Sequence, residues 1–255
     1  MIIVSKIKDR TGEFGVSSQG EKMTIVRYGN KNDIDVQFDD GTIVVHKRYG
    51  NFKRGNIKNP MTPILYGVGY FGIGKFKSRD ENGKQTKCYK AWESMLQRCY
   101  EPKYQAKYQT YKNCTVCKEW HNYQEFAKWD NENYYEVGNE QMALDKDILC
   151  KGNKVYSPET CVFVPQFINK LFIKRDNVRG EYPIGVHKHR DKFKAQLNKG
   201  NERMYLGTYN TPEEAFLVYK QAKEQYIKEV ANEYKLLIPY ELYEAMMNYE
   251  VEITD

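Results

Sequence analysis

Residues 182–220 read YPIGVHKHRDKFKAQLNKGNERMYLGTYNTPEEAFLVYK, and this stretch decides the fold of the C-terminal part of the chain. Three short runs in which apolar and polar residues alternate predict three antiparallel strands. A helix is expected to follow, because Thr211 is a favoured N-cap, Pro212 fits the first helical position and Glu214 completes a capping box. The helix face against the sheet is expected to carry the apolar residues that recur at helical spacing: Ala215, Val218, Tyr219, Ala222, Tyr226 and Val230.

Strand alternation also predicts which side chains of this small sheet face away from the helix. If Val186 points toward the helix, the outward face carries basic, polar and aromatic side chains: His187, His189, Lys194, Gln196, Arg203 and Tyr205. A β-element of this size fits the major groove of duplex DNA, where Arg can read guanine and Gln can read adenine. The sequence therefore predicts a double-stranded DNA partner.

The same stretch contains three short motifs in order: Gly-Val, then Phe-Lys-Ala-x-Leu, then Leu-Gly-Thr-Tyr-x-Thr-x-Glu-Glu-Ala. This pattern resembles the DNA-binding domain of the plant ethylene-response factors, the Apetala type. The resemblance implies a three-stranded sheet plus helix over residues 178–235. It also implies that the groove-contacting positions fall on His187, His189, Gln196, Asn198, Arg203 and Tyr205.

An ordered series of blocks lies upstream: WxxMxxRCY at 92–100, CTVCKEW at 114–120, LDKD at 144–147, GN at 152–153, YSPETC at 156–161 and then Asn169. The series resembles the bacteriophage relatives of the HNH (His-Me finger) endonucleases, in which relatives of the ethylene-response-factor domain follow the finger. The resemblance implies a phage-encoded protein with a helical and ββα finger module over residues 88–175. It implies a divalent metal, Mg²⁺ or Mn²⁺, on Asp145 and Asp147, and catalytic positions at Asp145, Lys146, Asp147, Asn153 and Asn169.

Lys146 stands where this family places the histidine that activates water, and no histidine lies between His121 and His187. A lysine, with an ordinary pKa of about 10.4, cannot act as a base near neutral pH unless that pKa is strongly lowered. Two hypotheses about the finger stay open: a metal-dependent DNA endonuclease, and a scaffold that no longer cleaves. Two rival functions also stay open: a regulator or counter-defence factor that binds a host protein, and RNA binding by the N-terminal domain and the C-terminal sheet.

Residues 1–60 are typical of a small β-barrel of the Src-homology-three or Tudor type. Asp40-Gly41 marks a tight hairpin turn, and three runs have the alternation of half-buried strands: Met23–Tyr28, Ile34–Phe38 and Thr42–His46. Residues 61–87 are expected to form a linker, and helices are expected over 89–100 and 122–130. Residues 236–255 are expected to form an acidic C-terminal helix or tail, with the helix beginning at Pro239. The predicted fold class is therefore multidomain α+β.

Composition limits the classes of partner, cellular location and metal site that the chain can have. The 255 residues include 40 Lys and Arg against 34 Asp and Glu, a net charge of +6, which favours polyanionic partners without specifying one. No apolar run is long enough for a membrane span and the first residues lack a signal-peptide pattern, so a protein of the host cytoplasm is expected. A structural zinc ion is not expected, because Cys150 and Cys161 are too widely spaced to complete the Cys114-x-x-Cys117 pair. The sequence leaves homo-oligomerisation and the target DNA sequence open.

Overall fold

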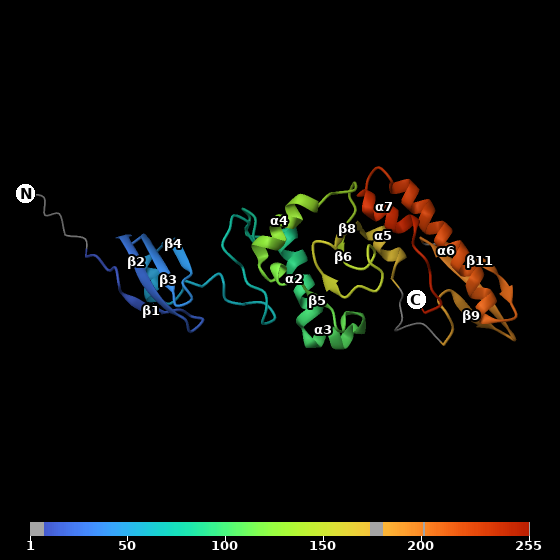
Figure 1. Ribbon diagram of the computed structural model, residues 1–255, viewed down its shortest axis with the longest axis horizontal. Coiled ribbons are helices and arrows are strands. Elements are labelled where there is room, and N and C mark those ends of the chain that lie inside the picture. The colour runs from blue at the N-terminus through green and yellow to red at the C-terminus, as the bar shows by residue number, and fades with distance from the viewer. Residues whose placement is uncertain (1–7, 174–180, 201, 255) are drawn as a thin grey trace, which may run out of the picture. The chain divides into compact units, whose positions relative to one another are not determined.

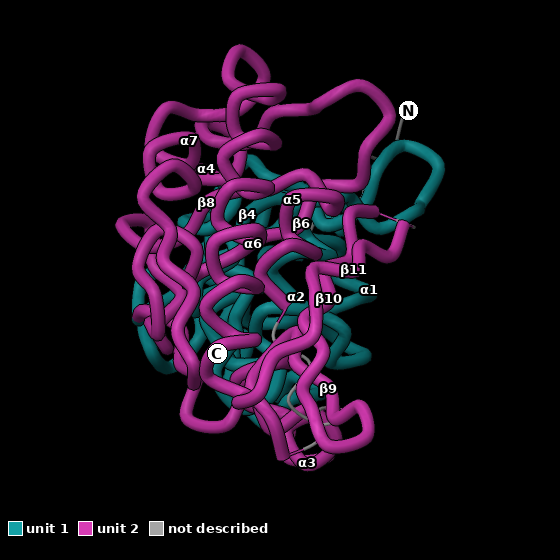
Figure 2. The backbone as a smooth tube through the Cα atoms, turned by 90° about the vertical axis from the view of Figure 1, so that its right-hand side faces the viewer, with its two compact units in different colours: residues 1–96, 118–127 teal, residues 97–117, 128–255 magenta. Residues whose placement is uncertain are grey.

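The computed structural model describes residues 8–173, 181–200 and 202–254 as a mixed α+β fold with several separate sheets (Figure 1). The strands are β1 Phe14–Val16, β2 Lys22–Asn30, β3 Asp33–Phe38, β4 Ile43–Lys47, β5 Thr115–Val116, β6 Met142–Asp145, β7 Val155–Tyr156, β8 Val162–Pro165, β9 Val186–His189, β10 Lys192–Lys199 and β11 Glu202–Tyr209. The helices are α1 Tyr49–Lys53, α2 Lys87–Tyr100, α3 Pro102–Lys107, α4 Tyr123–Asn133, α5 Gln166–Leu171, α6 Pro212–Tyr234 and α7 Tyr240–Met247, with 3₁₀ turns η1 Gln109–Tyr111 and η2 Glu119–His121. Two compact units are formed by residues 1–96 with 118–127, and by residues 97–117 with 128–255 (Figure 2).

The N-terminal strands form an open antiparallel sheet in the order β1-β2-β3-β4. The three predicted strands are confirmed as β2, β3 and β4, and their alternate residues point into one core: Met23, Ile25, Ile34, Val36, Phe38 and Val44. The predicted small barrel is not confirmed, because the sheet is open and no pairing joins β1 to β4 within the described residues. Phe52 of α1 packs into the same core and is 2% exposed, so a short helix contributes to burying the inner face of the sheet.

The helices of the first unit follow the predicted apolar spacing. Trp92 of α2 is fully buried, and its indole Nε1–H donates to the carbonyl of Trp120 over 2.7 Å. Tyr123, at the start of α4, stacks on Phe71 with ring centroids 5.2 Å apart. The Gln124 side chain donates to the Phe76 carbonyl over 3.0 Å. These contacts hold residues 61–86 against α2 and α4. The described residues of this segment form isolated β-bridges and no longer strand.

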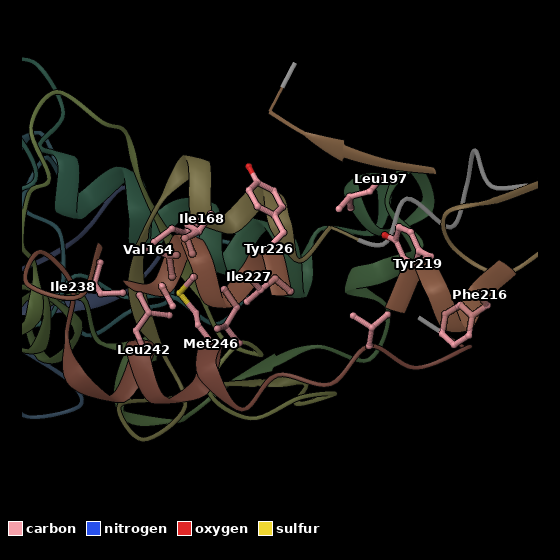
Figure 3. Close-up of a cluster of buried hydrophobic side chains, with 14 of the residues drawn as sticks. Val164, Ile168, Leu197, Phe216, Tyr219, Tyr226, Ile227, Ile238, Leu242 and Met246 are labelled. Carbon is pink, nitrogen blue, oxygen red and sulfur yellow. The ribbon is translucent and has the colours of Figure 1, made fainter. Parts of the chain in front are cut away.

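The second unit contains one large hydrophobic core (Figure 3). Its three-stranded sheet has the order β11-β10-β9, and α6 packs on one side of it, as the sequence predicted. Val164 of β8 and Ile168 of α5 lie in the same core as Ile227 of α6. Helix α7 closes the core with Leu242 and Met246, both fully buried, which confirms a helix after Pro239. The segment that contains β8 and α5 and the β9–β11 sheet with α6 therefore stabilise each other through shared apolar surface.

Two local features fix how α6 meets its sheet. The Thr211 hydroxyl accepts the Glu214 backbone N–H over 3.2 Å and the Glu214 carboxylate accepts the Thr211 N–H over 3.3 Å, which is the predicted capping box. Gly185 has a φ of 77°, and a Cβ built there would lie 2.0 Å from Cδ2 of Tyr219. Only glycine allows both the left-handed backbone and the close approach of the α6 ring.

Among the helices within residues 8–173, 181–200 and 202–254, none has the length and apolar character needed to cross a membrane.

Candidate nucleic-acid interface and finger site

The face of the β9–β11 sheet that is turned away from α6 collects the predicted DNA-contacting side chains. Ala195 and Leu197 of β10 are buried beneath α6, so the alternate residues of β10 point outward. Antiparallel pairing then aligns outward residues in rows across the sheet: His189 with Lys192, His187 with Lys194 and Thr208, Gln196 with Tyr205, and Asn198 with Arg203. We call these nine residues the outer face. All seven predicted DNA-contacting residues belong to it.

Six residues of the outer face are exposed, while Lys194, Gln196 and Thr208 are half-buried, and the described residues of its rows include no carboxylate. Tyr205 is 61% exposed, its hydroxyl lies 2.6 Å from the Thr208 hydroxyl, and the Lys194 ammonium lies 5.4 Å from the centre of its ring. The two acidic residues nearest in sequence lie elsewhere, Asp191 in the β9–β10 turn and Glu202 on the α6 side of β11. The result is a flat surface with donors, one large aromatic ring and positive charge.

Two members of the outer face, Lys192 and Thr208, were missed from the sequence. Strand alternation from Lys194 identifies Lys192, which is exposed at the start of β10. Thr208 could not be placed in the same way, because a β-bulge between Ala195 and Gln196 shifts the register of β11. A bulge inserts a residue and changes which side chains face outward beyond it.

The predicted finger residues Asp145, Lys146, Asp147 and Asn153 lie together at the end of β6. The Asn153 side-chain amide donates to the carbonyls of Lys146 over 2.7 Å and Val155 over 2.6 Å, which closes the loop between β6 and β7. Asn169 is on α5, and within the described residues its side chain has no hydrogen bond to this group. The structure thus brings four of the five predicted catalytic residues together.

Lys146 is the centre of this group. It is 4% exposed, yet its ammonium donates to the Asn153 carbonyl over 2.9 Å and lies 3.2 Å from Oδ2 of Asp147. The ring of Tyr156 lies 5.8 Å from the same nitrogen. A buried ammonium with a carbonyl and a carboxylate partner is a satisfied charge, which is the condition for keeping a lysine inside a protein.

Asp145 is held differently from its neighbour. Its Oδ1 accepts the backbone N–H groups of Asp147 over 2.9 Å and Ile148 over 2.8 Å, so it shapes the turn after β6. Burial, and secondly the negative charge of Asp147, raise the pKa of Asp145 to about 6. Asp147 is 44% exposed at its side chain and keeps contact with solvent.

These residues do not fit a divalent metal. Oδ1 of Asp145 is engaged by two backbone donors, and Asp147 is paired with the Lys146 ammonium, which already supplies positive charge at this point. A metal ion would meet the repulsion of that ammonium in a poorly solvated site. In the described part of the chain, no third acidic, histidine or cysteine side chain joins the two carboxylates within metal-binding reach.

Another acidic group was not identified from the sequence. Asp33, Asp35 and His46 have ligand atoms within 4.8 Å of one another in the N-terminal sheet. Arg27 engages both carboxylates, at 2.8 Å to Asp33 and 2.5 Å to Asp35, and thereby lowers the pKa of each. The group is a surface ion-pair network whose oxygens are already occupied.

The described cysteines are free thiols, and three of them, Cys99, Cys114 and Cys161, are buried. Burial raises the pKa of Cys99 and of Cys161 to about 12, whereas Cys150 is exposed.

Comparison of the chain with models of protein families, with curated proteins and with solved structures found no match.

Proposed function

We propose that this protein binds double-stranded DNA through the outer face of the β9–β11 sheet. The observation that carries the proposal is the outer face itself: nine aligned residues with three Lys or Arg side chains, two His and no carboxylate. Such a face suits the phosphate backbone and the base edges of a groove, which together present acceptors and negative charge. The resemblance of residues 178–235 to the ethylene-response-factor domain supports the same partner.

The chemistry of the rows suggests a division of work. Lys192 and Lys194 suit phosphate contacts, which give affinity and salt dependence. Arg203 and Gln196 suit base edges, because guanidinium can bind guanine and amide can bind adenine with two hydrogen bonds each. Tyr205 is the cross-strand partner of Gln196, two residues along β11 from Arg203, and its ring offers a flat surface for a sugar or a thymine methyl group. Asn198, paired with Arg203, can assist at the same base step.

We propose further that the predicted finger is a scaffold and does not cleave DNA, in a protein that the resemblance suggests is phage-encoded. Lys146 is buried where the resemblance calls for a histidine base, and its nitrogen is engaged by Asn153 and Asp147, so it lacks the access needed to activate water. Val164 and Ile168, from β8 and α5 of the finger, share the core that supports α6 and the sheet. Supporting the DNA-binding sheet is a sufficient role for this region.

The proposal is tested by titrating a fluorescent DNA duplex with the full chain at several salt concentrations. A variant with Lys192→Gln, Lys194→Gln and Arg203→Gln should bind more weakly, and loss of the two lysine–phosphate contacts should reduce the slope of log affinity against log salt by about 2. The matched control removes the same charge from exposed lysines elsewhere: Lys31→Gln, Lys58→Gln and Lys235→Gln. If the two variants bind duplex alike, the outer face is not the DNA-binding surface. Preference for single-stranded RNA over duplex would favour the RNA hypothesis instead.

A further inference from the structure

A second positively charged surface lies on α3 and on the two residues that flank η1, outside the residues used so far. We define the α3–η1 surface as Lys103, Tyr104, Lys107, Tyr108 and Lys112. Its three lysines are exposed, Tyr108 is 38% exposed, and no acidic residue occurs from Pro102 to Cys117. A run of this length with lysines, tyrosines and no carboxylate is an electropositive patch.

The surface is held in a fixed conformation. The Gln105 side chain donates to the carbonyls of Cys99 over 2.6 Å and Tyr111 over 3.3 Å, which ties the short helix to the end of α2 and to η1. The ring of Tyr104 lies 4.7 Å from that of Tyr108 and 5.8 Å from that of Tyr111. Little conformational entropy would therefore be lost when a ligand binds.

The α3–η1 surface is also attached to the finger. Strand β5 pairs in parallel with β7, and the Lys154 ammonium donates to the Thr110 carbonyl over 3.2 Å. Lys154 follows Asn153 directly, so its charge lies between the finger turn and the α3–η1 surface. Lys154 therefore adds one exposed positive charge beside Thr110 of η1, while the loop before it carries the buried Lys146 and the partly exposed Asp147 carboxylate.

We propose that the α3–η1 surface binds the sugar–phosphate backbone of duplex DNA beyond the segment held by the outer face. This inference rests on the proposed function, because it assumes a duplex already bound by the sheet. Three lysine ammonium groups and the tyrosine hydroxyls suit phosphate oxygens. Base stacking is disfavoured, because the ring of Tyr108 is packed beside Tyr104 and has the Lys107 ammonium 5.1 Å from its centre.

The test uses the full chain and a duplex of about 30 base pairs, with fluorescence anisotropy between about 50 and 200 mM KCl. The variant carries Lys103→Gln, Lys107→Gln and Lys112→Gln, and the control again carries Lys31→Gln, Lys58→Gln and Lys235→Gln. We expect the surface variant to bind at least about tenfold more weakly and to lose about 2–3 from its salt slope, with an unchanged melting temperature. The control should stay close to the natural chain.

The outcomes separate this inference from the proposed function. If the surface variant behaves like the control while the outer-face variant binds weakly, the α3–η1 surface does not contact DNA and the outer face still does. If the surface variant binds weakly while the outer-face variant behaves like the control, the α3–η1 surface binds DNA and the proposed role of the sheet is wrong. If the natural chain does not bind duplex, both are overturned.

Discussion

Replacement of Asp145 by Asn should stabilise the protein near neutral pH. The Asn side-chain oxygen can still accept the N–H groups of Asp147 and Ile148, so the turn after β6 is kept. The variant removes a buried charge whose pKa is raised from 3.8 to about 6 by burial and by Asp147. A folded-state pKa above the unfolded value means that the folded protein holds its proton more tightly, so stability is lost as pH rises through 6.

The shift fixes the size and pH range of the effect. A pKa shift of this size corresponds to about 3 kcal/mol, and we expect the variant to gain about 1–3 kcal/mol of stability at pH 7.5. The gain should vanish below about pH 4, where Asp145 is protonated in both states. Urea denaturation of both chains at pH 4.0, 5.5 and 7.5 measures this. A variant that is less stable at pH 7.5, or a difference that does not change with pH, would refute this account of the Asp145 site.

Three further predictions follow from single contacts. Gly185→Ala should cost more than about 2 kcal/mol of stability because its Cβ meets Tyr219, whereas Gly200→Ala, with no atom within 4 Å, should lose only about 1 kcal/mol to backbone strain; urea midpoints compare them. Ellman's reagent should label Cys150 rapidly, but Cys99 and Cys161 only after unfolding. Neither the natural chain nor Lys146→His should nick plasmid DNA with Mn²⁺, and EDTA-sensitive nicking by either would restore the endonuclease hypothesis.

The parts of the fold that could be predicted from the sequence depend on patterns among residues close together in the chain. The capping box at Thr211 and the alternation around Ala195 depend on residues close in sequence, so the sheet, α6 and most of the outer face could be predicted. Closure of the N-terminal sheet depends on pairing between its first and last strands, which no local pattern encodes, and the predicted barrel is not confirmed because the described sheet is open. Thr208 was missed because a bulge, unmarked in the sequence, sets the register of β11.

The predicted finger shows the same limit at a single residue. The sequence identified Lys146 as the position that departs from the pattern of the family it resembles, and it left the consequence open. Burial of Lys146 and its bonds to Asn153 and Asp147 depend on how the loop returns from β6 to β7, which spacing alone does not reveal. Asn169 fell in the predicted order of blocks, but order along the chain does not establish contact with the turn.

The central claim is that the outer face meets duplex DNA, and acetylation of lysines in the natural chain tests it most directly. The full chain is acetylated briefly with and without saturating duplex, and the labelled amines are quantified by mass spectrometry. We predict that duplex protects Lys192 and Lys194 and leaves Lys31 and Lys58, exposed in the N-terminal part of the chain, as reactive as before. Equal labelling of Lys192 and Lys194 in the free and the DNA-saturated protein would contradict the claim.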